Sequence, residues 1–248
     1  MEHTDNNLTT VTYSTQPLTD VSSMSRCCIV QEEDTFAVSG CCSMKNVYSV
    51  YGHSGEGNVK YLFKVKDNSN KGLKWCFGAD RLPVNIDVST VSVVNGNEER
   101  KAFVSLSRPC KNCHHTYVSI VCAVSGESLG TIDQPCTCAS PTFEIKDESD
   151  MVRYHIVIQC EQQGFFCRQW CCCAGNPVEC DIYGPEGMGE AVGKIYRKGR
   201  KGCCCSRVEC FYIDFPKEAS SQDKIRLICA GILIDHLFFE EDTHTAGS

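Results

Sequence analysis

Residues 225–239 read Ile-Arg-Leu-Ile-Cys-Ala-Gly-Ile-Leu-Ile-Asp-His-Leu-Phe-Phe, a run that is apolar almost all the way round a helix. Such a helix must be buried on every side, either in lipid or in the interior of the protein. Spanning the hydrocarbon of a bilayer takes about 20 apolar residues. This run has only 15 residues and carries Asp235 and His236 near its end. The sequence therefore predicts a helix that is buried inside the protein.

Short segments that alternate apolar and polar residues precede this run, and turn residues such as Ser125-Gly126 separate them. A period of two is typical of β-strands with one buried face. The expected strands are Val47–Tyr51, Val59–Val65, Gly72–Phe77, Val84–Val88, Ala102–Leu106, Tyr117–Ala123, Ser128–Ile132, Phe143–Lys146, Val152–Ile158, Val178–Ile182, Ala191–Tyr196 and Val208–Phe215. About twelve strands predict a closed barrel or a sandwich, because closure removes exposed sheet edges.

A barrel of this size needs an interior filler, since about eight strands already close around a core of side chains. We therefore expect the apolar helix to thread the barrel, and the fold class to be all-β with one buried helix. The chain reads as one domain. Residues 1–35 are expected to form a flexible polar tail, residues 36–242 the barrel, and residues 243–248 a short C-terminal tail.

Cysteine is unusually frequent, with 21 in 248 residues, and it occurs in adjacent pairs and triples such as Cys27-Cys28. Neighbouring thiols cannot all reach separate partners in a compact disulfide framework. The N-terminal residues Met1–Asp5 lack the basic start and apolar run of a secretory signal. Both observations indicate a reducing, cytosolic environment. The formal net charge of -7 argues against a general nucleic-acid binder.

Several motifs resemble those of the phospholipid scramblase family. Residues 228–240, Ile-Cys-Ala-Gly-Ile-Leu-Ile-Asp-His-Leu-Phe-Phe-Glu, are similar to the family's C-terminal apolar helix. Val192-Gly193-Lys194-Ile195 and Phe211-Tyr212-Ile213-Asp214-Phe215-Pro216 resemble two further segments of the family. Leu106-Ser107-Arg108-Pro109 with Cys110 resembles its arginine–proline cysteine stretch, and the likeness extends over roughly residues 47–242.

The resemblance implies a fold and a function. The implied fold is the tubby-like fold, a closed barrel of about twelve strands around a C-terminal hydrophobic helix. The implied function is ATP-independent, bidirectional movement of phospholipids between membrane leaflets, with a response to calcium. Membrane phospholipids are the implied partners.

The implied calcium site is altered in this chain. The family's proposed calcium segment begins Asp-Ala-Asp-Asn, and the matching residues here are Arg207-Val208-Glu209-Cys210. Calcium prefers several oxygen ligands, so arginine is a poor replacement for a carboxylate. The remaining candidate ligands are Glu209, Asp214, Glu218 and Asp223. The alternative interpretation is that these residues are solvated charges at a junction between a strand and a helix.

Clustered cysteines are palmitoylation sites in the family, and the densest runs here are Cys171, Cys172 and Cys173, and Cys203, Cys204 and Cys205. One acyl chain binds a membrane weakly, and stable attachment needs a second chain or a basic patch. A basic patch precedes the second run and consists of Lys194, Arg197, Lys198, Arg200 and Lys201. Each basic residue near an anionic leaflet adds about 1 kcal/mol.

These features predict a lipid anchor at the cytoplasmic face of the plasma membrane, against its anionic inner leaflet. A solvated basic turn with ordinary thiols is the alternative. The same stretch overlaps a region linked to nuclear import in the family, which predicts a nuclear fraction as well.

Zinc is the competing interpretation of the cysteines. Cys110-x-x-Cys113-His114-His115 together with Cys136-x-Cys138 contains enough ligands for a tetrahedral zinc site. The chain has no Gly-rich phosphate loop ending in Lys-Ser/Thr and no His-Glu-x-x-His motif, so we expect no enzyme. Besides a scramblase, two functions stay open: a membrane-tethered, palmitoylated interaction or signalling module without transport activity, and a soluble zinc-stabilised binding module.

Overall fold

A computed structural model describes residues 11–13, 17–32, 47–54, 59–69, 83–94, 97–108, 116–135, 141–159, 179–187, 189–199 and 209–236. The described strands are β1 (Val11–Tyr13), β2 (Arg26–Gln31), β3 (Val47–His53), β4 (Val59–Asp67), β5 (Val84–Val94), β6 (Asn97–Arg108), β7 (Thr116–Cys122), β8 (Ser128–Gln134), β9 (Thr142–Lys146), β10 (Val152–Ile158), β11 (Glu179–Tyr183), β12 (Gly193–Gly199) and β13 (Glu209–Asp214). The described helices are α1 (Pro17–Ser22) and α3 (Ser221–Ile234).

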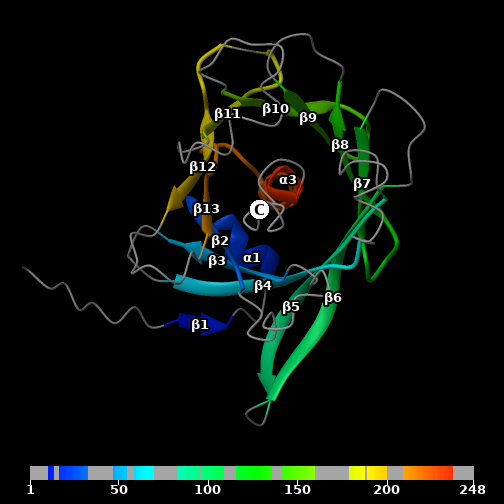
Figure 1. Cartoon of the computed structure of the whole chain (residues 1–248), viewed down its shortest axis with the longest axis vertical. Coiled ribbons are helices and arrows are strands. Elements are labelled where there is room, and N and C mark those ends of the chain that lie inside the picture. Colours follow the sequence, from blue (N-terminus) through cyan, green and yellow to red (C-terminus); the bar gives the residue numbers. More distant parts are fainter. Residues whose placement is uncertain are drawn as a thin grey trace, which may run out of the picture.

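Strands β2 to β13 form a closed antiparallel barrel of twelve strands (Figure 1). Each strand pairs with the next one along the chain, and β13 returns to pair with β2, with Ile213 opposite Cys27 and Cys210 opposite Val30. Strand β1 lies outside this ring and pairs in parallel with β4. The predicted tubby-like architecture is confirmed.

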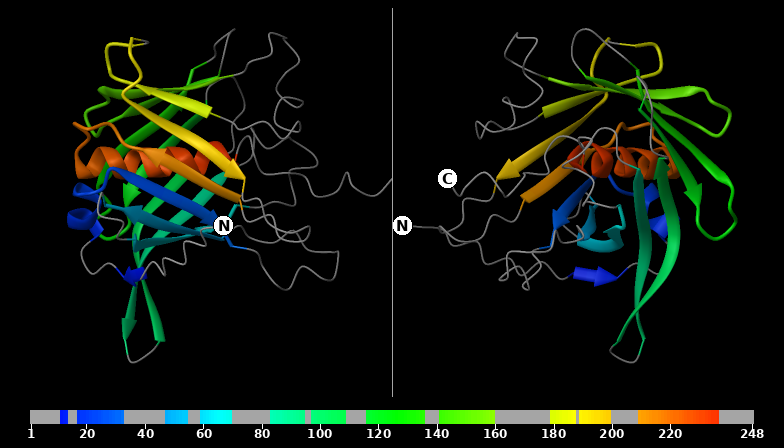
Figure 2. Two further views of the ribbon diagram at one scale, coloured as in Figure 1. Left: turned by 90° about the vertical axis from the view of Figure 1, so that its left-hand side faces the viewer. Right: turned by 45° about the vertical axis from the view of Figure 1, so that its right-hand side comes forward.

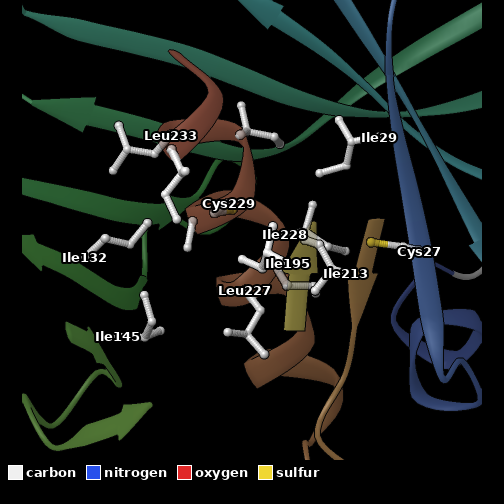
Figure 3. Packing of buried hydrophobic residues seen from close by; sticks show 14 of the residues in the cluster. Cys27, Ile29, Ile132, Ile145, Ile195, Ile213, Leu227, Ile228, Cys229 and Leu233 are labelled. Atoms are coloured by element: carbon white, nitrogen blue, oxygen red, sulfur yellow. The ribbon is translucent and has the colours of Figure 1, made fainter. Parts of the chain in front are cut away.

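Helix α3 runs through the middle of the barrel, as predicted (Figures 1 and 2). All its residues from Asp223 to Ile234 are buried. Figure 3 shows Leu227, Ile228 and Leu233 of α3 among inward-pointing side chains of the surrounding strands, including Ile132 and Ile145. Burying each such side chain contributes about 1.5–3 kcal/mol to the stability of the folded protein. The barrel wall therefore takes the place of lipid around the apolar surface of the helix. In the part of the chain that the structure describes, neither α1 nor α3 combines the length and the apolar character of a membrane-spanning helix.

The alternation of buried residues explains why these segments are strands. In β9, Phe143 and Ile145 are fully buried, while their neighbours along the strand are partly exposed. Every expected strand that lies in the described residues is present, although several begin or end elsewhere than predicted, and β5 extends to Val94 where Val88 was the expected end. The expected strand Gly72–Phe77 and the expected tail 243–248 lie outside the described residues.

The expectation of a flexible tail over residues 1–35 is wrong for residues 17–32. These residues contain α1 and β2, and β2 is the strand that closes the barrel against β13. Cys27 and Ile29 of β2 face the core and are almost fully buried. The four apolar residues from Cys27 to Val30 show no alternation, which is why the period-two criterion missed this strand.

Candidate functional site

The two ends of the barrel differ in which connections between strands they hold. Because the strands are antiparallel, successive connections lie at alternate ends. The connections β5–β6, β7–β8, β9–β10 and β11–β12 lie at one end, together with α1 and the start of α3; we call it the turn end. The connections 33–46, 70–82, 109–115, 136–140, 160–178 and 200–208 join strands at the opposite end, which we call the cysteine end.

The name of the second end follows from the sequence of its connections. Six of the 21 cysteines lie in described residues, and the other fifteen all lie in these six connections. The predicted lipidation residues Cys171 to Cys173 lie in connection 160–178, and Cys203 to Cys205 lie in connection 200–208. Both runs are outside the described residues. The described strands that flank these two connections end and begin at the same end of the barrel.

The cysteine and histidine residues of the zinc interpretation also lie outside the described residues. They belong to connections 109–115 and 136–140, which start from and return to the cysteine end. Among the described residues, no group of three or more His, Cys, Asp or Glu side chains is arranged to hold a metal ion. A zinc site in these connections stays a prediction.

Two residues of the predicted basic patch, Lys194 and Arg197, lie on opposite sides of strand β12. Lys194 lies on the outer side of β12 and forms an ion pair with Glu179 of β11. Arg197, three residues later, lies on the opposite side of the same strand, with its guanidinium 5.9 Å from the ring of the buried Phe211. Lys198 belongs to β12, whereas Arg200 and Lys201 lie outside the described residues. Side chains alternate along a strand, so neighbours in sequence do not share a face here.

The four predicted calcium ligands are not gathered at one place. Glu209 begins β13 at the cysteine end, while Asp214 ends the same strand at the turn end. Asp214 pairs with Arg26 of β2, with 3.2 Å between Asp214 Oδ2 and Arg26 Nη2. Glu218 is exposed. Calcium binding by these residues stays a prediction, and it would have to compete with the arginine partners.

Asp223 is buried and serves as the anchor of the first turn of α3. Its carboxylate lies 2.8 Å from Arg226 Nη1 and 3.3 Å from Arg153 Nη2 of β10. It also accepts a hydrogen bond from Ser220, the N-cap residue, which completes a capping box. Burial alone would raise the pKa of Asp223, but the hydrogen bonds from Ser220 and Arg153 outweigh burial and hold the pKa below its ordinary value. The carboxylate is therefore an internal counter-ion of the barrel.

Arg226 extends this network to the barrel wall. Its guanidinium donates to Glu148 Oε2 at 2.6 Å and to the carbonyl oxygen of Leu129. Gly130 of β8 leaves room for Arg226, because a Cβ at position 130 would lie only 3.1 Å from Arg226 Nε. The same Cβ would also overlap the backbone oxygen of Lys146 in β9. Gly130 also has a φ of 127°, which other residues rarely adopt.

The other end of α3 is also tied to the barrel. His236 follows the helix, and its Nδ1 lies 3.2 Å from Oδ2 of Asp67 on β4. Both side chains are about 1% exposed. Burial alone would raise the pKa of Asp67, but its interactions with His236 and Ser69 outweigh burial and bring the pKa to about 2. His236 is therefore a buried group that has a polar partner.

Lys224 and Arg226, the two cations in the first turns of α3, are not among the site residues predicted from the sequence. A signal was available, since Asp223-Lys224-Ile225-Arg226 places three charges at the start of a helix that is otherwise apolar. Charged residues in a fully buried helix must be paired or hydrogen-bonded. Their partners, Glu148, Arg153 and the end of α1, come from distant parts of the chain and cannot be read from sequence spacing.

Comparison with known proteins agrees with this architecture. The sequence matches the family described as Scramblase over residues 6–241, which is nearly the whole chain. No curated protein and no solved structure matches the chain. This family is not one of enzymes in the catalytic sense, and its members interact with membrane lipids. The matched range includes the closed barrel and its central helix, and the chain therefore belongs to the Scramblase family.

Proposed function

We propose that this chain promotes ATP-independent, bidirectional movement of phospholipids between the leaflets of a membrane. The observation that carries the proposal is the family match over residues 6–241 together with the barrel that encloses α3. The proposed activity includes a response to calcium.

We further infer how the barrel meets the membrane. Fifteen cysteines belong to connections at the cysteine end. Acylation of two or more of them, for example in Cys171–Cys173 and Cys203–Cys205, would supply the two lipid anchors that stable attachment needs. The turn end is a poor membrane surface, because exposed carboxylates are frequent there: Glu127, Glu148, Asp150, Glu186, Glu190 and Glu218. An anionic inner leaflet repels such a surface. The cysteine end would therefore face the cytoplasmic leaflet of the plasma membrane.

A second function is favoured by the burial of α3. Lipid headgroups that cross a bilayer need a polar path. In this fold the most apolar segment packs against the barrel wall, and its charged residues pair within the protein. A membrane-tethered, palmitoylated interaction or signalling module without transport activity would use the same fold and the same anchors. Residence of part of the protein in the nucleus would fit this second function.

Reconstitution separates the two functions. The full chain, acylated and purified from a eukaryotic host, is placed in vesicles that carry a fluorescent phospholipid in both leaflets, and dithionite reduces the dye in the outer leaflet. Scrambling predicts loss of nearly all fluorescence, and a tethered module predicts loss of about half, as in protein-free vesicles, where only the outer leaflet reacts. The assay is run with EDTA and with millimolar calcium. Loss limited to the outer leaflet in both conditions would refute the transport proposal.

A further inference from the structure

The end of the barrel where α3 begins is covered by the N-terminal segment 17–24. Val21 of α1 is fully buried and Met24 is 3% exposed, so both apolar side chains point into the protein. Met24 packs against Gly52 of β3, since a Cβ on Gly52 would overlap Met24 Sδ and Cε. Helix α1 contacts α3 and β4, and Asp20 of α1 forms an ion pair with Lys60 of β4. Segment 17–24 therefore lies over the first turns of α3 (Figure 2).

A single buried cation connects this segment to α3. Lys224 Nζ donates to the carbonyl oxygens of Ser22 at 2.8 Å, Met24 at 2.7 Å and Val21 at 3.3 Å. The ammonium also lies 5.7 Å from the centre of the Phe215 ring, within the range of a cation–π interaction. Lys224 is 5% exposed, and among the described residues no carboxylate pairs with it. The end of a helix carries partial negative charge, so these carbonyl oxygens suit a cation.

The local sequence does not hold this segment in place by itself. An isolated helix shorter than about 12 residues is marginal in water, and α1 has 6 residues. Its position depends on two buried side chains, one partly exposed ion pair and the three hydrogen bonds of Lys224. Elements with few buried contacts open locally before the rest of the protein unfolds.

We propose that residues 17–24 form a releasable plug of the barrel, latched by the ammonium of Lys224. When the latch is broken, the plug leaves and the first turns of α3 become accessible to solvent while the barrel strands stay paired. The device controls access to the apolar interior from the turn end. It goes beyond the proposed lipid movement and does not depend on it.

Hydrogen exchange of the full chain, followed by mass spectrometry, tests the proposal. In Lys224→Met, exchange in residues 17–24 and in residues 221–227 should both accelerate by roughly tenfold or more, because hydrogen bonds from a charged donor are lost. Exchange in β9 and β10 should stay unchanged. The control Lys60→Met removes the partly exposed ion pair with Asp20 and, because the lysine side chain is 42% exposed, should change exchange by no more than about threefold.

Gly52→Ala provides a second route to the same opening, because the added methyl group displaces Met24 and leaves Lys224 in place. It should accelerate exchange in the same two segments, and it decides the matter if Lys224→Met fails to fold. Three results would overturn the proposal: unchanged exchange in residues 221–227, acceleration in residues 17–24 alone, or equal acceleration in every strand.

Discussion

The buried network at the start of α3 makes the sharpest prediction about stability. In Asp223→Ala, the guanidinium of Arg226, which is 3% exposed, loses its buried counter-ion and keeps Glu148, which is 54% exposed, and the carbonyl oxygen of Leu129. Breaking a buried ion pair by removing one partner costs about 3–5 kcal/mol. The lost capping box adds up to about 1 kcal/mol, while Glu148 still offsets part of the charge. We expect Asp223→Ala to lower the free energy of unfolding by about 3 kcal/mol.

The double variant Asp223→Ala/Arg226→Met separates the uncompensated charge from a general packing defect. Removing both charges should restore at least about 1 kcal/mol relative to Asp223→Ala alone, because residues in one network are coupled. Urea denaturation followed by circular dichroism gives the unfolding free energies. The control is Asp214→Ala, which breaks the surface pair with Arg26 and should cost less than about 1 kcal/mol. Equal losses in Asp223→Ala and Asp214→Ala, or a double variant no more stable than Asp223→Ala, would refute the reasoning.

Three further predictions concern the core, acid stability and membrane attachment. Leu227→Ala, at a fully buried position of α3, should lower the free energy of unfolding in urea by about 3 kcal/mol. The control Leu18→Ala, at a 47% exposed position, should lower it by less than about 0.5 kcal/mol. Equal losses would contradict the packing of the helix. The pKa of Asp67 is about 2 in the folded state, against an ordinary value of 3.8. The ionised carboxylate therefore stabilises the folded protein by about 2 kcal/mol above pH 3.8. This stabilisation is lost as the pH falls from 3.8 through 2. Asp67→Asn should flatten the dependence of unfolding free energy on pH between 5 and 2, and an unchanged slope would show that His236 does not stabilise the ionised carboxylate. Serine replacement of Cys203 to Cys205 should move the protein to the soluble fraction of a cell lysate. The control Cys210→Ser, at a buried cysteine of β13, should not. Unchanged membrane association of the triple variant would contradict the prediction that Cys203 to Cys205 form a lipid anchor.

The helix and most strands could be predicted because they follow from local patterns. An apolar run too short for a bilayer has to be buried by protein, and α3 is buried in this way from Asp223 to Ile234. The alternation of apolar and polar residues predicted the bounds of β9 and β10 almost to the residue. Strand β2 was missed because both faces of its central residues are covered, which removes the alternation. The expected number of twelve strands is correct, although β2 is one of the twelve and Gly72–Phe77 lies outside the described residues.

The candidate site was less predictable, because charge partners come from distant parts of the chain. Calcium binding by Asp214 and Asp223 stays a prediction, but their arginine partners could not be read from the sequence. Arg26 pairs with Asp214 from a position 188 residues away, and Arg153 reaches Asp223 from 70 residues away. The basic patch is predicted from residues that are close together in sequence, and the period of the strand places two of them, Lys194 and Arg197, on opposite sides.

The central claim is that the barrel itself, without lipid, buries the apolar helix α3. The most direct measurement is backbone hydrogen exchange of residues 225–234 in the full chain, purified and kept without detergent or lipid. The account predicts a monodisperse protein in which these amides exchange as slowly as those of the most protected barrel strands, and in which added vesicles change their rates little. Rapid exchange in buffer, with protection that appears only when detergent or a bilayer is added, would contradict the account.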